Sequence, residues 1–352
     1  MLRCLFIFSL TFVVYCTNAQ KNHPVRNLVF EGAGIRGIAY CGVLQALEEQ
    51  HLLDSVQRVG GTSAGALIAL SVSLGYQGAE IERLINTTLF RTLNDGRYIF
   101  LGGFNRLRKY YGWYRGNKVD GWIGGIVKEK TGDPDITFGE LHRRGFKDLY
   151  VTGTNLSRQQ LVVFSYERYP LMKVKDAVRI SMSIPLYFKA SFMDSAGRTF
   201  QKPAQNLSIM ADGGFVANFP VKIFDSARYT GASSNLHSVN PETLGFRIDR
   251  DEQIVNDRQQ KGLAAMPIRN LKGYVAAFYN LVIENLNRQT LTEADWLRTV
   301  SISDGEIGPR IRKLSGEEIH RLEENGYRAT LQYLALPAPE ERNLSTRATG
   351  AR

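Results

Sequence analysis

The sequence predicts an α/β fold with a mainly parallel central sheet, and two consecutive units near the start of the chain carry this prediction. A short apolar strand is expected at 27–30, followed by a glycine-rich turn and apolar residues at helical spacing over 37–49. The same order repeats with a strand at 56–59, a second glycine turn and an apolar helix over 64–74. Two strand–turn–helix units in succession imply parallel strands joined by right-handed crossovers.

The rest of the chain continues the alternation of strands and helices. Further strands are expected at 149–155, 161–165, 207–211 and 298–303. A helix is expected from Gln289 and an amphipathic helix after Leu314. Because no internal repeat or long linker is visible, the simplest partition is one domain over about 25–335, followed by a Pro-, Arg- and Ser-rich tail at 336–352 that we expect to be disordered.

The first nineteen residues differ from the rest and predict a signal peptide. Arg3 precedes the apolar run Leu5–Tyr15, and small and polar residues then lead to Ala19. This order is typical of a secretory signal cleaved after Ala19. We therefore expect a protein that is secreted, periplasmic or membrane-associated after export. A retained membrane anchor and lipoprotein processing at Cys16 are the alternatives.

The net charge of the chain indicates which partners it is expected to bind. The 352 residues contain 44 Lys and Arg against 34 Asp and Glu, which gives a formal charge of +10. Such a balance suits anionic partners such as phospholipid head groups. No concentrated Lys/Arg tract is present, so we expect no nucleic-acid partner.

After signal cleavage Cys41 is the one remaining thiol, which excludes an internal disulfide. The apolar surroundings of Cys41 predict a small buried side chain.

The segment GTSAG predicts a nucleophile elbow at Ser63. It matches the Gly-x-Ser-x-Gly pattern and lies between an expected strand and an expected apolar helix. Gly61 and Gly65 remove the side chains that would clash in so sharp a turn. Ser63 would then lie at the helix N-terminus, where the helix dipole favours developing negative charge. An ordinary Gly/Ser turn is the alternative for this pentapeptide taken alone.

The segment GAGIRG predicts an oxyanion hole. A turn of glycine and alanine lets backbone N–H groups point into a cleft, and a tetrahedral intermediate needs such donors. The candidate residues are Gly32, Ala33, Gly34, Arg36 and Gly37. The Arg36 side chain either adds positive charge beside a phosphate or carboxylate, or is an ordinary surface arginine. The segment also fits a dinucleotide-binding turn, but that site needs an acidic residue at the end of the next strand.

The acidic residue available for a dinucleotide site is misplaced. Asp54 lies before the second expected strand, and that strand ends in GTSAG instead. A serine acyl hydrolase therefore fits these two segments better than an oxidoreductase.

The base that fits Ser63 best is Asp212. It follows an apolar strand and precedes Gly213 and Gly214, so that its carboxylate would emerge beside a tight turn. A carboxylate can accept the serine proton directly, provided that apolar surroundings raise its pKa from about 3.9. His237 and His320, which follow Asp212, lie in polar surroundings without a catalytic pattern. No His/Asp/Glu cluster has ligand spacing, so we expect neither a metal nor another cofactor.

The three motifs, in this order, resemble those of the patatin-like phospholipases. The segments Asp212–Pro220 (DGGFVANFP) and Arg179–Phe188 (RISMSIPLYF) are also similar to segments of that family. The resemblance covers about 27–335 and implies a three-layer α/β/α architecture. It also implies hydrolysis of fatty-acyl esters of phospholipids or related lipids by a Ser–Asp dyad, with Ser63 as the nucleophile and Asp212 as the base. A non-catalytic lipid-binding or secretion-associated protein that keeps the fold is the alternative, and an oxidoreductase is the weakest of the three candidate functions.

One position departs from the family pattern. The oxyanion loop of the family often reads Gly-Gly-Gly, and here the middle position is Ala33. A left-handed backbone at an alanine would cost roughly 1 kcal/mol.

Aromatic and basic residues alternate between Phe90 and Lys130, which suits contact with anionic lipid at a membrane surface. A helical cap that buries these aromatic side chains is an equal and compatible alternative. The aromatic residues are Phe100, Phe104, Tyr110, Tyr111, Trp113, Tyr114 and Trp122, and the basic ones are Arg91, Arg97, Arg106, Arg108, Lys109, Arg115 and Lys118.

Overall fold

The structure is a computed structural model that describes residues 24–92, 95, 101–231, 238–284, 288–308 and 312–337. The expected signal segment 1–19 lies outside the described residues, as do Arg97, Phe100, His237 and the tail beyond 337. Residues Pro24–Leu336 form one compact unit.

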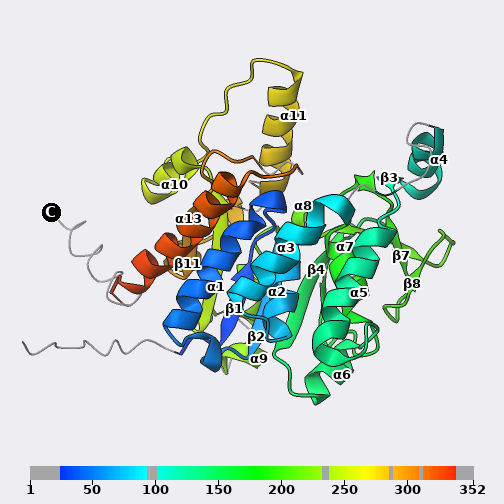
Figure 1. Ribbon diagram of the computed structural model, residues 1–352, viewed down its shortest axis with the longest axis horizontal. Helices are drawn as coiled ribbons and strands as arrows, with labels where there is room; N and C mark the ends of the chain where they lie inside the picture. Colours follow the sequence, from blue (N-terminus) through cyan, green and yellow to red (C-terminus); the bar gives the residue numbers. More distant parts are fainter. Residues whose placement is uncertain are drawn as a thin grey trace, which may run out of the picture. The chain divides into compact units, whose positions relative to one another are not determined.

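A mainly parallel sheet forms the centre of this unit (Figure 1). Within the described residues its strand order is β11-β10-β1-β2-β4-β9-β7-β8, and β5 pairs with β4. The parallel strands are β1 (Asn27–Phe30), β2 (Arg58–Gly61), β4 (Asp148–Asn155), β10 (Thr243–Asp249) and β11 (Thr299–Ser303). The predicted parallel pairing of the first two strands is confirmed, and β10 is a central strand that the sequence analysis did not identify.

The other half of the sheet is antiparallel. It contains β5 (Gln160–Phe164), β7 (Ser191–Met193), β8 (Thr199–Phe200) and β9 (Ser208–Asp212). A separate two-stranded sheet pairs β3 (Gly112–Tyr114) with β6 (Leu186–Phe188).

One face of the sheet is covered by long helices that bury the main hydrophobic core (Figure 1). They are α1 (Ala39–Glu49), α2 (Ala64–Ser73), α3 (Gly78–Thr92), α5 (Asn117–Thr131), α7 (Val174–Ser181) and α13 (Gly316–Leu334). Helix α1 packs against α13 and α3, and α5 packs against α7. Cys41 lies buried in α1, as its apolar surroundings predict.

Shorter elements cover the opposite face around a small second core. That core contains Val29, Tyr150, Phe219, Val221 and Phe224. The covering elements are α8 (Gly214–Ala217), η3 (Val221–Phe224) and α9 (Ala227–Thr230).

The remaining elements lie at the ends of the sheet or connect its strands. They are η1 (Gly34–Ile38), η2 (Leu53–Ser55), α4 (Leu101–Tyr110), α6 (Phe138–Arg143), α10 (Asp251–Arg258), α11 (Leu271–Tyr279), the π-helical turn η4 (Asn280–Glu284), η5 (Arg288–Thr290) and α12 (Glu293–Leu297). The helix expected from Gln289 is thus only a short turn and a five-residue helix. Among the described residues, no helix is both long and apolar enough to span a bilayer.

Candidate active site

The register of the sheet brings Ser63 and Asp212 to the same level. Gly61, the last residue of β2, lies opposite Val151 on β4, and Asp212 lies opposite Gly153, two residues further along β4. Ser63 follows Gly61 by two residues and therefore reaches that level. Its Oγ donates a hydrogen bond of 2.7 Å to Asp212 Oδ2.

Ser63 lies on a strained turn between β2 and α2. Its φ of 53° is in the left-handed region, which a non-glycine residue adopts only at a cost of about 1–3 kcal/mol. A Cβ on Gly61 would lie 2.3 Å from Gly65 O, so strand and helix approach each other only because both positions are glycine. The Ser63 N–H donates to Ser181 Oγ at 2.8 Å and so anchors the turn to the end of α7.

Asp212 is buried and is held by hydrogen bonds on both carboxylate oxygens. Its side chain is almost inaccessible to solvent, and Oδ1 accepts from the Gly214 N–H at 2.8 Å. Burial raises the pKa of Asp212 to about 6, and the hydrogen bonds from Ser63 and Gly214 limit that rise. Gly213 lies against β4, where a Cβ would meet Thr152 Oγ1 at 2.3 Å.

The glycine-rich loop lies beside Ser63 without backbone strain at Ala33. Ala33 has a φ of −128°, and the left-handed position is taken by Gly34 with a φ of 56°. Two of the N–H groups in the loop are already used, because Gly32 donates to Asn218 O at 3.0 Å and Arg36 to Ala33 O at 3.2 Å. The N–H groups of Ala33 and Gly34 donate to no acceptor in the described part of the chain.

Arg36 supports this loop from inside the protein. Its side chain is only 1% exposed, so the surface-arginine alternative is wrong. The guanidinium lies 3.6 Å from Asp304 and donates to Ala33 O at 3.2 Å. The residue therefore fixes the path of the loop and presents no charge to a ligand beside Ser63.

A small apolar hollow opens next to Ser63. Its volume is about 50 Å³ among the described residues, room for only a few water molecules. The lining residues are Gly34, Ile35, Gly37, Ile38, Ser63, Ala64, Leu67, Ile68, Ile85, Met182, Ile184 and Phe188. Such a lining suits a hydrocarbon chain rather than a polar substrate.

No described histidine takes part in this site. His51 and His320 are exposed, and His142 stacks on Tyr166 and bonds to Asp148. None of the three forms a hydrogen bond with Ser63 or Asp212. The described residues also contain no group of three or more His, Cys, Asp or Glu side chains that could hold a metal ion.

Three residues that position Ser63 and Asp212 were not identified from the sequence. Ser181 accepts from the Ser63 N–H, and Ser183 O accepts from the Asp212 N–H at 3.0 Å. The Asn218 amide donates to Gly32 O at 2.9 Å and so ties the end of α8 to the loop. All three lie in the segments RISMSIPLYF and DGGFVANFP, which the resemblance had singled out without assigning these residues a role.

The aromatic and basic segment divides between core and surface in its described part. Trp122 packs against the main core, whereas Phe104 is 66% exposed on α4. Arg106 is buried and donates to Trp113 O at 2.8 Å. Neither a purely buried cap nor a purely exposed surface describes this segment.

The chain is similar to several known proteins. A family model described as patatin-like phospholipase matches residues 28–225. The uncharacterized protein YqhO of Bacillus subtilis strain 168 is 31% identical over 210 residues, covering 57% of this chain and 67% of that protein. The probable lipid hydrolase 463L of Invertebrate iridescent virus 6 is 25% identical over 199 residues, covering 56% of this chain and 62% of that protein.

A solved structure confirms the fold. The crystal structure of VipD from Legionella pneumophila matches with a TM-score of 0.55 at 17% identity, over 89% of this chain and 67% of that chain. The chain thus spans about two thirds of the length of these relatives.

Proposed function

Since the chain belongs to the patatin-like phospholipase family, we propose that it is a serine lipid acyl hydrolase with Ser63 as the nucleophile and Asp212 as the general base. Its substrates are fatty-acyl esters of phospholipids or related lipids. Family membership and the lipid hydrolase relative support hydrolysis of lipids. The observation that carries the dyad is the 2.7 Å hydrogen bond from Ser63 Oγ to a buried carboxylate.

The first half of the reaction transfers the acyl group to Ser63. As Ser63 Oγ attacks the ester carbonyl carbon, its proton passes to Asp212 Oδ2, and the carbonyl electron pair moves onto oxygen. The raised pKa of Asp212 makes it a stronger base than an exposed aspartate. The unused N–H groups of Ala33 and Gly34 are the donors that stabilise the oxyanion. Collapse expels the alcohol, which takes the proton from Asp212.

The second half releases the fatty acid. Water attacks the acyl-enzyme carbonyl and gives its proton to Asp212, and the tetrahedral intermediate collapses with return of that proton to Ser63 Oγ. The apolar hollow beside Ser63 is where the start of the acyl chain lies. At about 50 Å³ it must widen to take a long chain, and the Met182 side chain in its wall is flexible enough to move.

Hydrolysis by the purified protein tests this function. We expect release of free fatty acid from phospholipid vesicles or from diacylglycerol, measured by mass spectrometry. If the folded protein released no fatty acid from any acylglycerol or phospholipid, the non-catalytic lipid-binding alternative would replace the proposal.

The rate of hydrolysis should depend on pH through Asp212. Only the ionised carboxylate accepts a proton, so kcat/KM on a soluble ester should rise with pH, reach half its maximum near pH 6 and level off above that value. The measurement is a pH–rate profile from pH 4.5 to 8.5, with far-UV circular dichroism to confirm folding at each pH. A flat profile would contradict an Asp212 base that titrates in this range.

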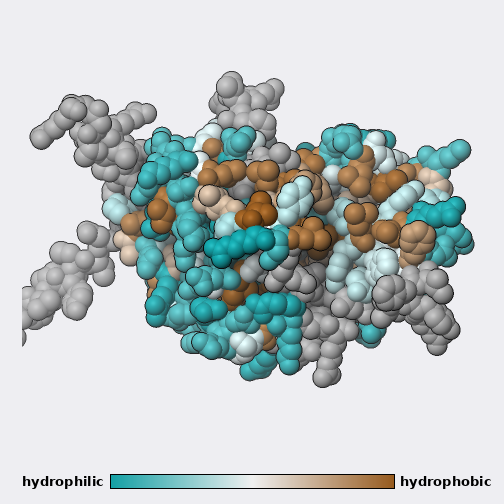
Figure 2. All heavy atoms as spheres, turned by 90° about the horizontal axis from the view of Figure 1, so that it is seen from above, coloured by the Kyte–Doolittle hydropathy of each residue, from teal (hydrophilic) through white to brown (hydrophobic). Residues whose placement is uncertain are grey.

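A lipid surface is the partner that we propose for the exposed side chains of α11. Leu271, Tyr274, Val275 and Phe278 recur at helical spacing on α11, Leu281 follows on η4, and all five side chains are more than half exposed. The turn η4 follows α11 and packs against α8. Helix α8 begins directly after Asp212 and Gly213, so η4 lies close to the proposed base in the chain's fold. Figure 2 looks down on the end of the unit from which α11 projects, and hydrophobic residues gather in a band across it.

Charged substitutions on α11 should weaken binding to vesicles. Burying an aromatic or leucine side chain in lipid is worth about 1.5–3 kcal/mol, so Leu271→Asp and Phe278→Asp should each lower the vesicle partition constant, measured by sedimentation, at least about tenfold. Leu171→Asp is the matched control, since Leu171 is as exposed as Leu271 (79% against 77%) but lies beside α6. Equal losses in all three variants would contradict docking through α11.

A further inference from the structure

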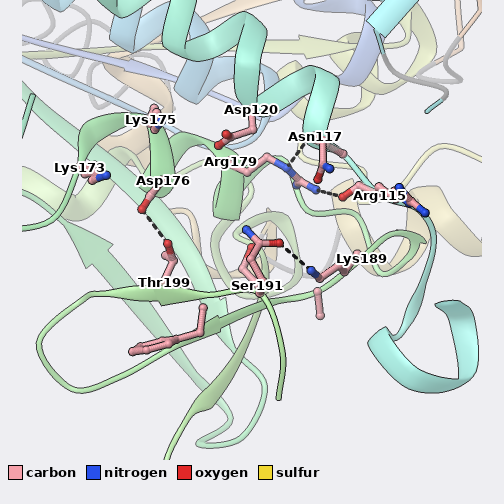
Figure 3. Close-up of a pocket in the computed structure, with 14 residues that line it drawn as sticks. Arg115, Asn117, Asp120, Lys173, Lys175, Asp176, Arg179, Lys189, Ser191 and Thr199 are labelled. Atoms are coloured by element: carbon pink, nitrogen blue, oxygen red, sulfur yellow. Dashed lines mark hydrogen bonds between the residues drawn. The ribbon is translucent and has the colours of Figure 1, made fainter. Parts of the chain in front are cut away.

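A second pocket, with more cationic than acidic side chains in its lining, lies beside the helix that supports the dyad. Its volume is about 250 Å³, and Figure 3 shows its lining. Five cationic side chains face two carboxylates, Asp120 and Asp176. The cations are Arg115, Lys173, Lys175, Arg179 and Lys189. The proposed reaction uses none of these side chains.

Two of the five cations share one carboxylate as their counter-ion. Lys173 Nζ lies 3.0 Å and Lys175 Nζ 2.7 Å from the Asp135 carboxylate. On the same side of the pocket, Asp176 accepts a hydrogen bond from Thr199 Oγ1 at 2.7 Å (Figure 3). Burial raises the pKa of Asp176.

The other three cations have no carboxylate within salt-bridge distance in the described parts of the chain. Lys189 Nζ donates to Gln201 Oε1 at 2.8 Å, which is a neutral oxygen. The Arg115 side chain is exposed at the rim of the pocket. Arg179 is only 9% exposed, although it is a full guanidinium charge.

Neutral oxygen atoms hold the Arg179 guanidinium in place. Nη1 donates to Ser183 Oγ at 2.7 Å and Nε to Gly116 O at 3.3 Å. Gly116 has a φ of 76°, and a Cβ there would lie 1.9 Å from Arg179 Nη2. The local chain is therefore shaped to admit this guanidinium.

Burial disfavours the charges of Arg179 and Lys189, and the charges of Arg179 and Arg115 repel that of Lys189. Burial lowers the pKa of Arg179 to about 10, although Asp120 and Asp95 act in the opposite direction from beyond salt-bridge distance. Burial also lowers the pKa of Lys189, and the charges of Arg179 and Arg115 lower it further. A bound anion would remove this repulsion and would gain charge-assisted hydrogen bonds.

The pocket is directly connected to the dyad. Arg179 and Ser181 lie two residues apart on α7, and Ser181 holds the Ser63 N–H. The Arg179 guanidinium also lies 4.9 Å from the centroid of the Phe188 ring. Phe188 in turn lines the apolar hollow beside Ser63, so this one side chain contacts both the hollow and the guanidinium.

We propose that this pocket binds a phosphate group, with Arg179 and Lys189 as its ligands and Arg115 adding positive charge at the rim. Planar guanidinium and ammonium groups together suit phosphate oxygens. The source of the phosphate is a lipid headgroup whose acyl ester reaches Ser63, or a free phosphate compound. The headgroup assignment rests on the proposed function, whereas phosphate binding itself does not.

Calorimetric titration of Ser63→Ala protein tests phosphate binding without turnover. Inorganic phosphate and glycerol 3-phosphate should bind at low ionic strength, and glycerol should not. Adding Lys189→Gln or Arg115→Gln should weaken binding about tenfold each, the loss expected for one charge-assisted contact. The matched control is Lys128→Gln, an exposed cation further along α5 that does not line the pocket. Absence of binding, or equal weakening by Lys128→Gln, would overturn the proposal.

Kinetics of the wild type and of Lys189→Gln, both with Ser63 intact, distinguish the two sources of phosphate. For a headgroup, glycerol 3-phosphate should inhibit phosphatidylglycerol hydrolysis competitively, and Lys189→Gln should lower the ratio of phosphatidylglycerol to diacylglycerol turnover about tenfold. For a free phosphate ligand, that ratio should stay constant while phosphate alters diacylglycerol turnover. If the wild type hydrolysed neither lipid, the proposed function would fail, and the calorimetry would still decide whether the pocket binds phosphate.

Discussion

Replacing Ser63 by alanine is expected to abolish ester hydrolysis, with a loss of at least about 10⁴-fold in kcat/KM. The physical reason is that Ser63 Oγ is the one hydroxyl that bonds to the buried Asp212 carboxylate among the described residues. The fold should persist, because alanine keeps the Cβ and the backbone N–H that donates to Ser181 Oγ. The measurement is fatty-acid release from phospholipid vesicles and from a soluble ester.

Ser71→Ala provides the matched control for this variant. Ser71 is buried on the same helix, α2, and its hydroxyl donates only to Leu67 O at 3.0 Å. We expect Ser71→Ala to keep most of the activity. If Ser63→Ala kept wild-type activity while its thermal melt was unchanged, another nucleophile would have to be sought.

Asp212→Asn should be nearly as damaging to activity and should stabilise the fold at neutral pH. An amide cannot accept the Ser63 proton, and loss of a general base typically costs 10²–10⁴-fold. Asparagine retains the shape of the side chain, and its amide oxygen can still accept from the Gly214 N–H. Folding of the variant should therefore be preserved.

The effect of Asp212 on stability follows from its raised pKa. A carboxyl with a pKa of about 6 in the folded protein, against an ordinary 3.8, stabilises the fold least when it is ionised. The stabilising contribution of the protonated carboxyl to the free energy of unfolding is fully present below about pH 4 and is lost as the pH rises through 6. At pH 8 we expect Asp212→Asn to exceed the wild type in free energy of unfolding by up to about 3 kcal/mol, with no such gain at pH 4. Urea titrations at both pH values measure this difference.

Histidine variants separate the dyad from a conventional triad. Neither His237 nor His320 has a catalytic pattern in the sequence, and His320 is exposed on α13. Replacing either one singly by alanine should leave most of the activity. A dead histidine variant beside an active Asp212→Asn would replace the dyad with a triad.

Local patterns made much of the fold and of the site predictable. The strand at 27–30 has the bounds that the apolar run predicted, and the elbow at Ser63 has the left-handed φ that the flanking glycines allow. The bounds of this strand and the backbone conformation at Ser63 depend on neighbouring residues, so each can be predicted from a single segment of the sequence. The direction of the Asp212 pKa shift was also accessible, because an aspartate behind an apolar strand is expected to be buried.

Features that depend on distant segments were not predictable in the same way. β10 is inserted between β1 and β11 although it comes more than 200 residues after β1, and its pattern was not recognised. Arg36 was weighed as a ligand contact or a surface residue, but its burial depends on Asp304, far along the chain. The cationic pocket likewise combines Arg115, Arg179 and Lys189 from separate elements.

The rate at which a fluorophosphonate labels the serine tests the dyad most directly, because it reports activation of the nucleophile without any lipid surface. We expect the probe to modify Ser63 in the wild type and in His320→Ala at the same second-order rate. In Asp212→Asn that rate should fall about 10²–10⁴-fold. Labelling of Asp212→Asn at the wild-type rate, or modification of a residue other than Ser63, would contradict a Ser63–Asp212 dyad.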